Sequence, residues 1–204
     1  MIIHNINQST EEWQALRLGK FTASNFHIFL GSSQTRTNEI YKKAAERITN
    51  KKCDQDFFKN GHIDRGHELE PIAREAYTFE TGNEVEEVGF IELDDFVGCS
   101  PDGLINGKGL LEIKCLDNHG FIKVKNKNYI APMHKTQIQF CLMVTDREYF
   151  DYVIFNPNFG DKGLIIKRVE RDEEYIEKIK IALDKAKKEV LEEIKLFNRN
   201  INYL

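Results

Sequence analysis

Residues 100–115 read SPDGLINGKGLLEIKC, and this stretch decides how the rest of the chain is interpreted. Its second half, at 109–115, has the apolar and β-branched residues of a strand, and the glycines before it are typical of a hairpin turn. Because side chains alternate between the two faces of a strand, Glu112 and Lys114 share one face. The other face is apolar and consists of Leu111, Ile113 and Cys115. The pattern therefore predicts that the apolar face enters the core and that the charged pair lines a cleft.

A second acid, Asp102, stands ten residues before Glu112, at the start of the predicted hairpin. A hairpin of this length can bring the two carboxylates together, and they repel each other unless a divalent cation binds between them. Mg²⁺ suits such a site because it prefers oxygen ligands and keeps water and phosphate in its shell. Lys114 beside the metal can orient or help deprotonate an attacking water. The stretch predicts phosphodiester hydrolysis, with a solvent-exposed polar hairpin as the alternative.

The composition is that of an ordinary globular protein. The chain has 204 residues, 41% hydrophobic and 30% charged, which favours one domain with one sizeable core. Its net charge is −4, so any nucleic acid has to bind through a local basic surface or through metal ions. Two basic groups offer such a surface: Lys108, Lys123, Lys125 and Lys127, and Lys42, Lys43, Arg47, Lys51 and Lys52. Their alternative interpretation is a solvated charged face.

Cysteine spacing and hydropathy exclude other classes. The four cysteines have no CxxC spacing, which argues against zinc and iron–sulfur sites. The first residues have no basic segment followed by an apolar run, and no apolar stretch approaches the roughly 20 residues that span a bilayer. We therefore expect a cytoplasmic protein with no membrane contact.

The periodicity of the chain predicts an α/β fold with helices on both faces of one mixed central sheet. Helices are expected at 9–19, 22–31, 39–52, 67–82, 131–145 and 173–197. Strands are expected within 84–100, 109–115, 148–157 and 162–170. In the first helix, Ser9 and Glu12 have the spacing of a capping box. Residues 32–38 are expected to form a polar loop, and Pro71 is expected in the first turn of its helix.

Five blocks of sequence occur in an order that resembles a known family. They are WQALRLGKFTAS from residue 13, RGHELEPIAREAY, SPDG, LEIKC and HKTQIQFCLMVT. This set is similar to the phage lambda-type exonucleases, the YqaJ-like viral recombinase and alkaline exonuclease family of the PD-(D/E)xK nuclease superfamily. The resemblance covers about residues 13 to 172.

The resemblance implies a restriction-endonuclease-like core in a single domain over residues 1–204. It further implies degradation of one strand of double-stranded DNA from the 5′ end, with two Mg²⁺ or Mn²⁺ ions per site. The 3′ single-stranded tails would serve a phage single-strand annealing protein during homologous recombination. A ring-shaped homotrimer and a phage or prophage origin in a bacterial host also follow from the resemblance.

Residue by residue, the resemblance assigns a catalytic cluster and a site for the 5′-phosphate. The catalytic cluster comprises Glu70, Asp102, Glu112, Lys114 and Gln137, and the metal ligands are Glu70, Asp102, Glu112 and the Ile113 carbonyl. The DNA end would be held by Arg17, Ser24 and Ser100, with Arg36 as the only candidate for a further arginine contact. On spacing alone, Glu70 fits a solvated acidic helix face and Gln137 a buried structural amide equally well.

Two rival functions remain at this stage. The nearer one is a structure-specific or helicase-coupled repair endonuclease with the same core. The other is a non-catalytic module that binds DNA ends, which the intact Asp102, Glu112 and Lys114 set disfavours.

Overall fold

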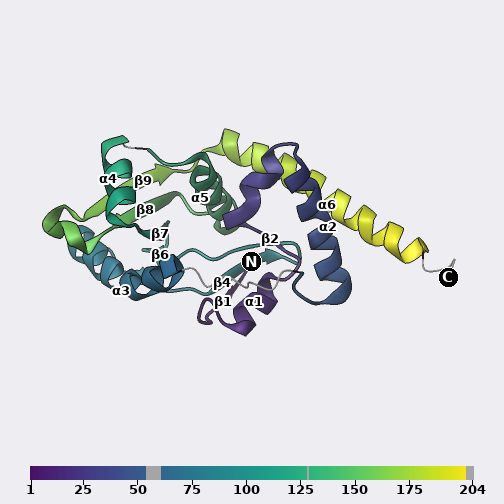
Figure 1. The fold of residues 1–204 in the computed structure, drawn as a ribbon, viewed down its shortest axis with the longest axis horizontal. Coiled ribbons are helices and arrows are strands. Elements are labelled where there is room, and N and C mark those ends of the chain that lie inside the picture. The colour runs from purple at the N-terminus through teal and green to yellow at the C-terminus, as the bar shows by residue number, and fades with distance from the viewer. Residues whose placement is uncertain (54–60, 128, 201–204) are drawn as a thin grey trace.

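The computed structural model describes residues 1–53, 61–127 and 129–200, with only the backbone described at 61–67 and at 200. Within these residues the chain forms two mixed β-sheets with helices packed around them, as Figure 1 shows. The predicted α/β class, with mixed β structure and flanking helices, is confirmed. The strands divide between two sheets, and the larger of them contains the strand of the predicted site.

The strands are short in the smaller sheet and longest around the predicted site. In chain order they are β1 (Ile2–His4), β2 (Phe21–Thr22), β3 (Val85–Glu86), β4 (Phe90–Asp94), β5 (Val97–Cys99), β6 (Gly103–Ile105), β7 (Gly109–Cys115), β8 (Tyr149–Phe155) and β9 (Leu164–Glu170). The smaller sheet has the order β1-β4-β5-β2 and the larger one β3-β6-β7-β8-β9. In the larger sheet β6 and β7 form the predicted antiparallel hairpin, and β7 runs parallel to β8. The strand that carries Glu112 and Lys114 is therefore an interior strand.

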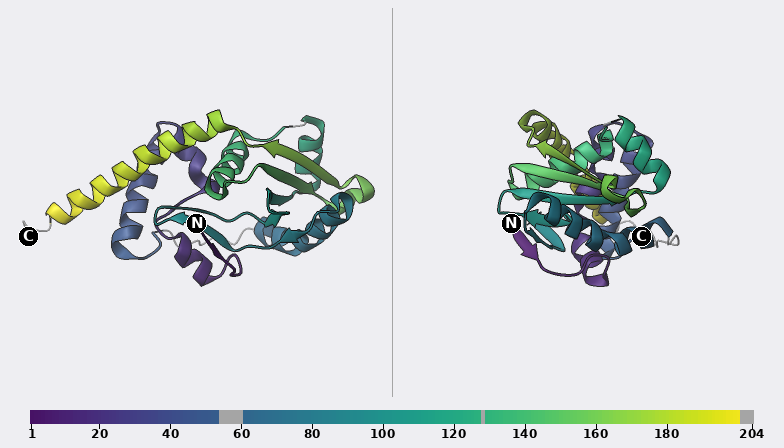
Figure 2. Two further views of the ribbon diagram at one scale, coloured as in Figure 1. Left: turned by 180° about the vertical axis from the view of Figure 1, so that it is seen from behind. Right: turned by 90° about the vertical axis from the view of Figure 1, so that its left-hand side faces the viewer.

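The helices are α1 (Glu11–Arg17), the 3₁₀ helix η1 (Ala23–Leu30), α2 (Gln34–Thr49), α3 (Gly61–Thr81), α4 (Asn118–Lys127), α5 (Pro132–Thr145), the 3₁₀ segment η2 (Pro157–Lys162) and α6 (Glu173–Asn200). Figures 1 and 2 show α4 at one end of the molecule and the C-terminal part of α6 extending from the other. None of the helices in these ranges is long and apolar enough to span a bilayer.

Two apolar clusters hold the larger sheet between α5 and α3. Leu110 of β7 belongs to the cluster that contains Ile138 of α5. Leu111, the next residue, belongs to the cluster that contains Ala73 and Tyr77 of α3. Burial of a side chain of this size contributes roughly 1.5–3 kcal/mol. The alternation of β7 thus sends its two faces toward two different helices, with the charged residues on the α5 side.

Three helix boundaries differ from the sequence-based prediction. Thr10, not Ser9, caps α1: its Oγ1 accepts a hydrogen bond from Trp13 N (3.2 Å), while Ser9 has a φ of 67°. Helix α2 begins at Gln34, inside the predicted polar loop, because the Ser33 side chain accepts from the backbone N–H three residues later. A polar run is typical of a loop and of a helix N-terminus alike, so the pattern did not separate them.

Helix α3 begins earlier than predicted and continues through Pro71. A proline inside a helix costs about 3 kcal/mol because it removes one backbone hydrogen bond. The complete burial of Ala73 and Tyr77 against the larger sheet offsets this cost. Helix α4 was not predicted, since its sequence NHGFIKVKNK has weak helix formers and buries only Phe121.

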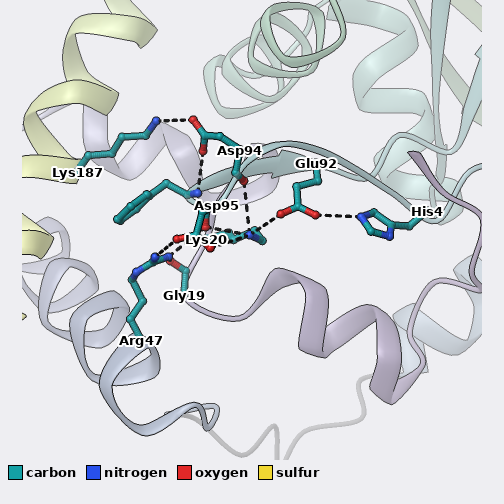
Figure 3. A network of polar contacts seen from close by, with 9 residues as sticks. His4, Gly19, Lys20, Arg47, Glu92, Asp94, Asp95 and Lys187 are labelled. Atoms are coloured by element: carbon teal, nitrogen blue, oxygen red, sulfur yellow. Dashed lines mark hydrogen bonds and ion pairs between the residues drawn. The ribbon is translucent and has the colours of Figure 1, made fainter. Parts of the chain in front are cut away.

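A polar network around Lys20 ties the smaller sheet to the helices beside it (Figure 3). Lys20 is buried, and its Nζ donates to Glu92 Oε1 (3.0 Å) and to a backbone carbonyl after β4 (2.9 Å). His4 of β1 contacts the other Glu92 oxygen, at 3.0 Å. Arg47 of α2 and Lys187 of α6 bind acidic side chains at the end of β4. The network therefore joins segments that are far apart in the sequence.

Candidate active site

The hairpin of β6 and β7 brings Asp102 against the middle of β7. The Asp102 backbone N–H donates to a carbonyl of β7 (2.9 Å), and Asp102 Oδ2 accepts from Ile113 N (2.7 Å). Gly107 makes the turn with a φ of +72°, a conformation that favours glycine. Gly103 has to be small, because a Cβ there would lie 2.3 Å from a side-chain carbon of β3. The turn chemistry of the quoted stretch thus fixes the position of its first acid.

Glu112 and Lys114 of β7 meet Gln137 of α5. Lys114 Nζ lies 2.5 Å from Glu112 Oε1, and Gln137 Nε2 donates to the same oxygen at 2.7 Å. Glu112 is buried and Lys114 half-buried. The predicted sharing of one strand face by Glu112 and Lys114 is therefore present, and the predicted glutamine lies against it. The catalytic roles assigned to these residues stay predictions.

Glu70 approaches the same cluster from α3. It lines a pocket of about 410 Å³ together with Asp102, Arg74 and the N-terminal residues 5–8. Arg74 stands one helical turn after Glu70 and donates to Glu70 Oε1 at 2.6 Å, and it also binds Glu87 at 3.0 Å. Glu70, from a helix, and Glu112, from a strand, therefore both lie close enough to Asp102 of the hairpin to repel its carboxylate.

The electrostatics of the cluster follow from this arrangement. Burial, together with the carboxylates of Glu112 and Glu70, raises the pKa of Asp102 above its usual range. Burial lowers the pKa of Lys114, but the Glu112 and Asp102 carboxylates outweigh it and raise that pKa overall, so the ammonium is kept charged. The cluster therefore favours positive charge at its centre.

The residues present fit a divalent cation. Glu112 Oε2 is a buried oxygen with no hydrogen-bond partner, which is costly unless something binds it. The raised pKa of Asp102 also indicates a cation site, since a bound cation would relieve the repulsion between Asp102 and its neighbouring carboxylates. In the described part of the chain, no group of three or more His, Cys, Asp or Glu side chains is already gathered closely enough to enclose a metal ion. Donors from the protein, Lys114, Gln137 and Ile113 N, instead bond the carboxylates.

Arg17 and Ser100, two of the residues that the resemblance assigns to the DNA end, contact each other in the structure. Arg17 Nη1 donates to Ser100 Oγ at 3.2 Å, and the guanidinium lies 4.0 Å from the centre of the Trp13 ring. Trp13 Nε1 donates to the same hydroxyl at 2.9 Å. Burial lowers the pKa of Arg17 to about 10. Ser100 stands two residues before Asp102, so this cationic group adjoins the carboxylates along the chain.

The other two residues of the predicted end site are placed differently. Ser24 is exposed in the first turn of η1. Arg36 lies in α2 instead of a loop, and its Nη2 pairs with Glu189 of α6 at 2.8 Å. The structure therefore brings Arg17 and Ser100 together and gives Arg36 a partner on another helix.

Three side chains at the site were not singled out from the sequence. Arg74 could have been found, because a spacing of four on a helix places it beside Glu70. Trp13 is the only tryptophan, but nothing in its spacing indicates Ser100 as its partner. Tyr152 of β8 contacts His134 Nδ1 through its hydroxyl (2.8 Å) and lies opposite Glu112 in the sheet. That pairing depends on strand register and leaves no local signal.

Comparison with solved structures gives the class of protein. The chain is 33% identical to an alkaline exonuclease from Laribacter hongkongensis, with a TM-score of 0.86, over 95% of this chain and 98% of that one. A second structure of that enzyme, in complex with dAMP, matches with the same values. A phage-related exonuclease from Haemophilus somnus 129PT matches at 16% identity and a TM-score of 0.64, over 87% of this chain and 96% of that one, and shows likeness of fold. The fold is therefore the restriction-endonuclease-like fold of phage-related exonucleases, and the predicted core is confirmed.

The family follows from the sequence. The description "YqaJ-like viral recombinase domain" matches residues 12–148, and the chain belongs to this family. No curated protein matches significantly. The family and the alkaline exonuclease likeness together support a phage-type exonuclease, which is a nuclease and a hydrolase.

Proposed function

We propose that the protein is a Mg²⁺-dependent exonuclease that degrades one strand of double-stranded DNA from the 5′ end and leaves 3′ single-stranded tails. The observation that carries this proposal is the meeting of Asp102 and Glu112 at Lys114, with Glu70 beside Asp102 and the buried Glu112 Oε2 lacking a hydrogen-bond partner. Membership in the YqaJ-like family supports the exonuclease chemistry.

The proposed mechanism divides the work among the clustered residues. When bound to Glu70, Asp102, Glu112 and the Ile113 carbonyl, two Mg²⁺ (or Mn²⁺) ions would stabilise charge on the attacking and leaving oxygens. Lys114, held charged by its neighbours, orients the attacking water and faces the negative charge that builds on the phosphate. The expected products are 5′-mononucleotides with a free 3′-hydroxyl on the remaining DNA.

Gln137 acts on Lys114 through Glu112 in this mechanism. Its amide donates to the same carboxylate oxygen that Lys114 binds, so it fixes the position of both groups. Gln137 also comes from α5, whereas Glu112 and Lys114 come from β7. The sheet and the helix must therefore stay in register for the cluster to hold.

The end preference is assigned to the cationic group of Arg17. The guanidinium and the Ser100 hydroxyl can both donate to a 5′-phosphate, and a charge-assisted bond of this kind contributes roughly 1.5–3 kcal/mol. Ser24, exposed at the start of η1, is proposed as a further contact. Arg36 would have to leave Glu189 to take part.

Some properties rest on the resemblance alone. We propose a ring-shaped homotrimer, a phage single-strand annealing protein as partner, and a cytoplasmic location in a bacterial host that carries the phage or prophage. Analytical ultracentrifugation of the purified protein tests the first of these directly.

The deciding experiment uses linear duplex DNA that is labelled along one strand, so that its 5′ end stays unmodified, with Mg²⁺ and then with EDTA. Matched duplexes carry 5′-phosphate or 5′-hydroxyl ends, and a covalently closed circle is the third substrate. We expect Mg²⁺-dependent release of mononucleotides from the linear duplexes, faster from 5′-phosphate ends, and an intact circle.

The Lys114→Ala variant separates binding from chemistry in the same assay. It should bind the linear duplex and lose most turnover. Cutting of the circle would show that the protein is an endonuclease. DNA binding without any Mg²⁺-dependent product would show that it is a non-catalytic module that binds DNA ends.

A further inference from the structure

The lysines of α2 and those of α4 have different surroundings in the structure. In α2, Lys42 lies 3.9 Å from Glu39 and Lys43 lies 3.2 Å from Glu46. The lysines of α4 are Lys123, Lys125 and Lys127. Among the residues that the structure describes, no carboxylate lies within ion-pair distance of these three. Helix α4 therefore presents positive charge that this protein, with a net charge of −4, does not neutralise locally.

Helix α4 is held firmly beside the candidate active site. It begins three residues after β7, the strand of Glu112 and Lys114. Its Phe121 is fully buried, and Asn156, also fully buried, donates to Leu116 O and to Asn118 Oδ1, both at 3.0 Å. These contacts anchor the start of the helix to the end of β8. The start of α4 is thus fixed relative to the strands that carry and adjoin Glu112 and Lys114.

Large apolar side chains stand exposed along the same segment. Ile122 of α4 is 47% exposed, Tyr129 after it is 52% exposed, and Met133 in the first turn of α5 is 44% exposed. Met133 lies one helical turn before Gln137, which contacts Glu112. We call these three residues, together with Lys123 and Lys127, the α4 surface.

We propose that the α4 surface binds unpaired DNA, namely the strand that the exonuclease leaves uncut. Lysines bind phosphates of paired and unpaired DNA alike. Apolar and aromatic side chains such as Ile122 and Tyr129 gain contact only with bases whose faces are open, because the bases of a duplex are stacked on each other. Lysines alternating with exposed apolar residues are therefore suited to a single strand. This inference rests on the proposed function, in which one strand becomes unpaired.

The test measures binding by fluorescence anisotropy in EDTA, so that no strand is cut. Three labelled ligands are compared: a single strand, a blunt duplex, and a duplex with a 3′ single-stranded tail. The variants are Tyr129→Ala and the double change Lys123→Ser with Lys127→Ser. Matched controls are Tyr41→Ala, an exposed tyrosine of α2, and Lys185→Ser with Lys188→Ser on α6.

We expect Tyr129→Ala to weaken binding of the tailed duplex and the single strand about ten-fold and to leave the blunt duplex unchanged. For the single strand, the double lysine variant should make the salt dependence less steep. The negative slope of the logarithm of the binding constant against the logarithm of the salt concentration should shrink by about 0.7 per lost phosphate contact. The control variants should match the wild type on all three ligands. Unfolding midpoints equal to the wild type show that each variant is folded.

Equal losses on blunt and tailed duplexes would show that α4 follows paired DNA and would overturn the inference. Wild-type affinities in both α4 variants would overturn it too. The proposed function is judged separately, by Mg²⁺-dependent cleavage with the wild-type protein. A wild type that cleaves, combined with α4 variants that bind normally, would refute only the inference about α4.

Discussion

Replacement of Lys114 by methionine should destabilise the protein as well as inactivate it. The Glu112 side chain is only 5% exposed, and Lys114, at 32%, is the cation that compensates it at 2.5 Å. Removing one partner of a buried ion pair costs about 3–5 kcal/mol, because the other charge is left uncompensated. Lys114 is partly exposed and Gln137 still bonds Glu112, so we expect a smaller loss, about 2–3 kcal/mol.

For a chain of this size, that loss corresponds to a fall in Tm of about 4–12 °C. The free energy of unfolding is measured by urea denaturation in EDTA, with the single tryptophan, Trp13, as the fluorescent probe. The double variant Glu112→Gln with Lys114→Met removes the charge that was left buried. It should recover most of the loss, and together with the single variant Glu112→Gln it gives the coupling energy of the pair.

Lys135→Met is the matched control, because Lys135 pairs with Asp172 at 3.1 Å on the surface. An exposed pair of this kind contributes about 1 kcal/mol or less. The reasoning is refuted if Lys114→Met unfolds within about 0.5 kcal/mol of the control, or if the double variant is less stable than Lys114→Met. Either result would mean that Glu112 is not held as a buried carboxylate by Lys114.

Three further outcomes are expected. The hydrogen bond from Lys20 holds the pKa of Glu92 below its usual range. The stability that Glu92 contributes is therefore complete above a pH of about 4.5 and is lost as the pH falls through the pKa of the folded state. Thermal unfolding between about pH 3 and pH 7 should show a smaller fall in Tm toward acid pH for Glu92→Gln than for the wild type. Arg17→Met should reduce the preference for 5′-phosphate over 5′-hydroxyl duplexes about ten-fold or more, measured as the ratio of initial rates. Tyr77→Phe removes a 2.7 Å hydrogen bond to the buried carboxylate of Asp151 and should cost about 1–2 kcal/mol in urea denaturation, whereas an unchanged midpoint would contradict the bond's importance.

The part of the site that comes from residues 100–115 could be predicted from the sequence. Strand periodicity and turn chemistry are local properties, and they placed Glu112 and Lys114 on one face and Asp102 beside them. The role of Gln137 came from the resemblance, and the structure places its amide on Glu112. Local patterns therefore identified Asp102 and the pair of Glu112 and Lys114, and the resemblance to the family identified Gln137.

The division into two sheets could not be predicted in the same way. His4 pairs with Phe90 across most of the N-terminal half of the chain, and β1 is too short to have a pattern of its own. Lys20 and Glu92 likewise meet only after folding. Such contacts are decided by which distant segments pack together, and a local window contains no information on them. The same reason explains why Arg36 was assigned to a DNA contact while the structure pairs it with Glu189.

The position of Glu70 shows how a distant contact completes a locally encoded site. Glu70 and Tyr77 are seven residues apart on α3, which puts them on the same face of the helix. Tyr77 binds Asp151 of β8, and Arg168 of β9 donates twice to the same carboxylate, at 2.8 Å each. This network attaches α3 to the larger sheet two turns from Glu70, so the helix cannot shift without breaking buried hydrogen bonds. Glu70 is therefore held beside Asp102 by Arg74 within the site and by this network outside it.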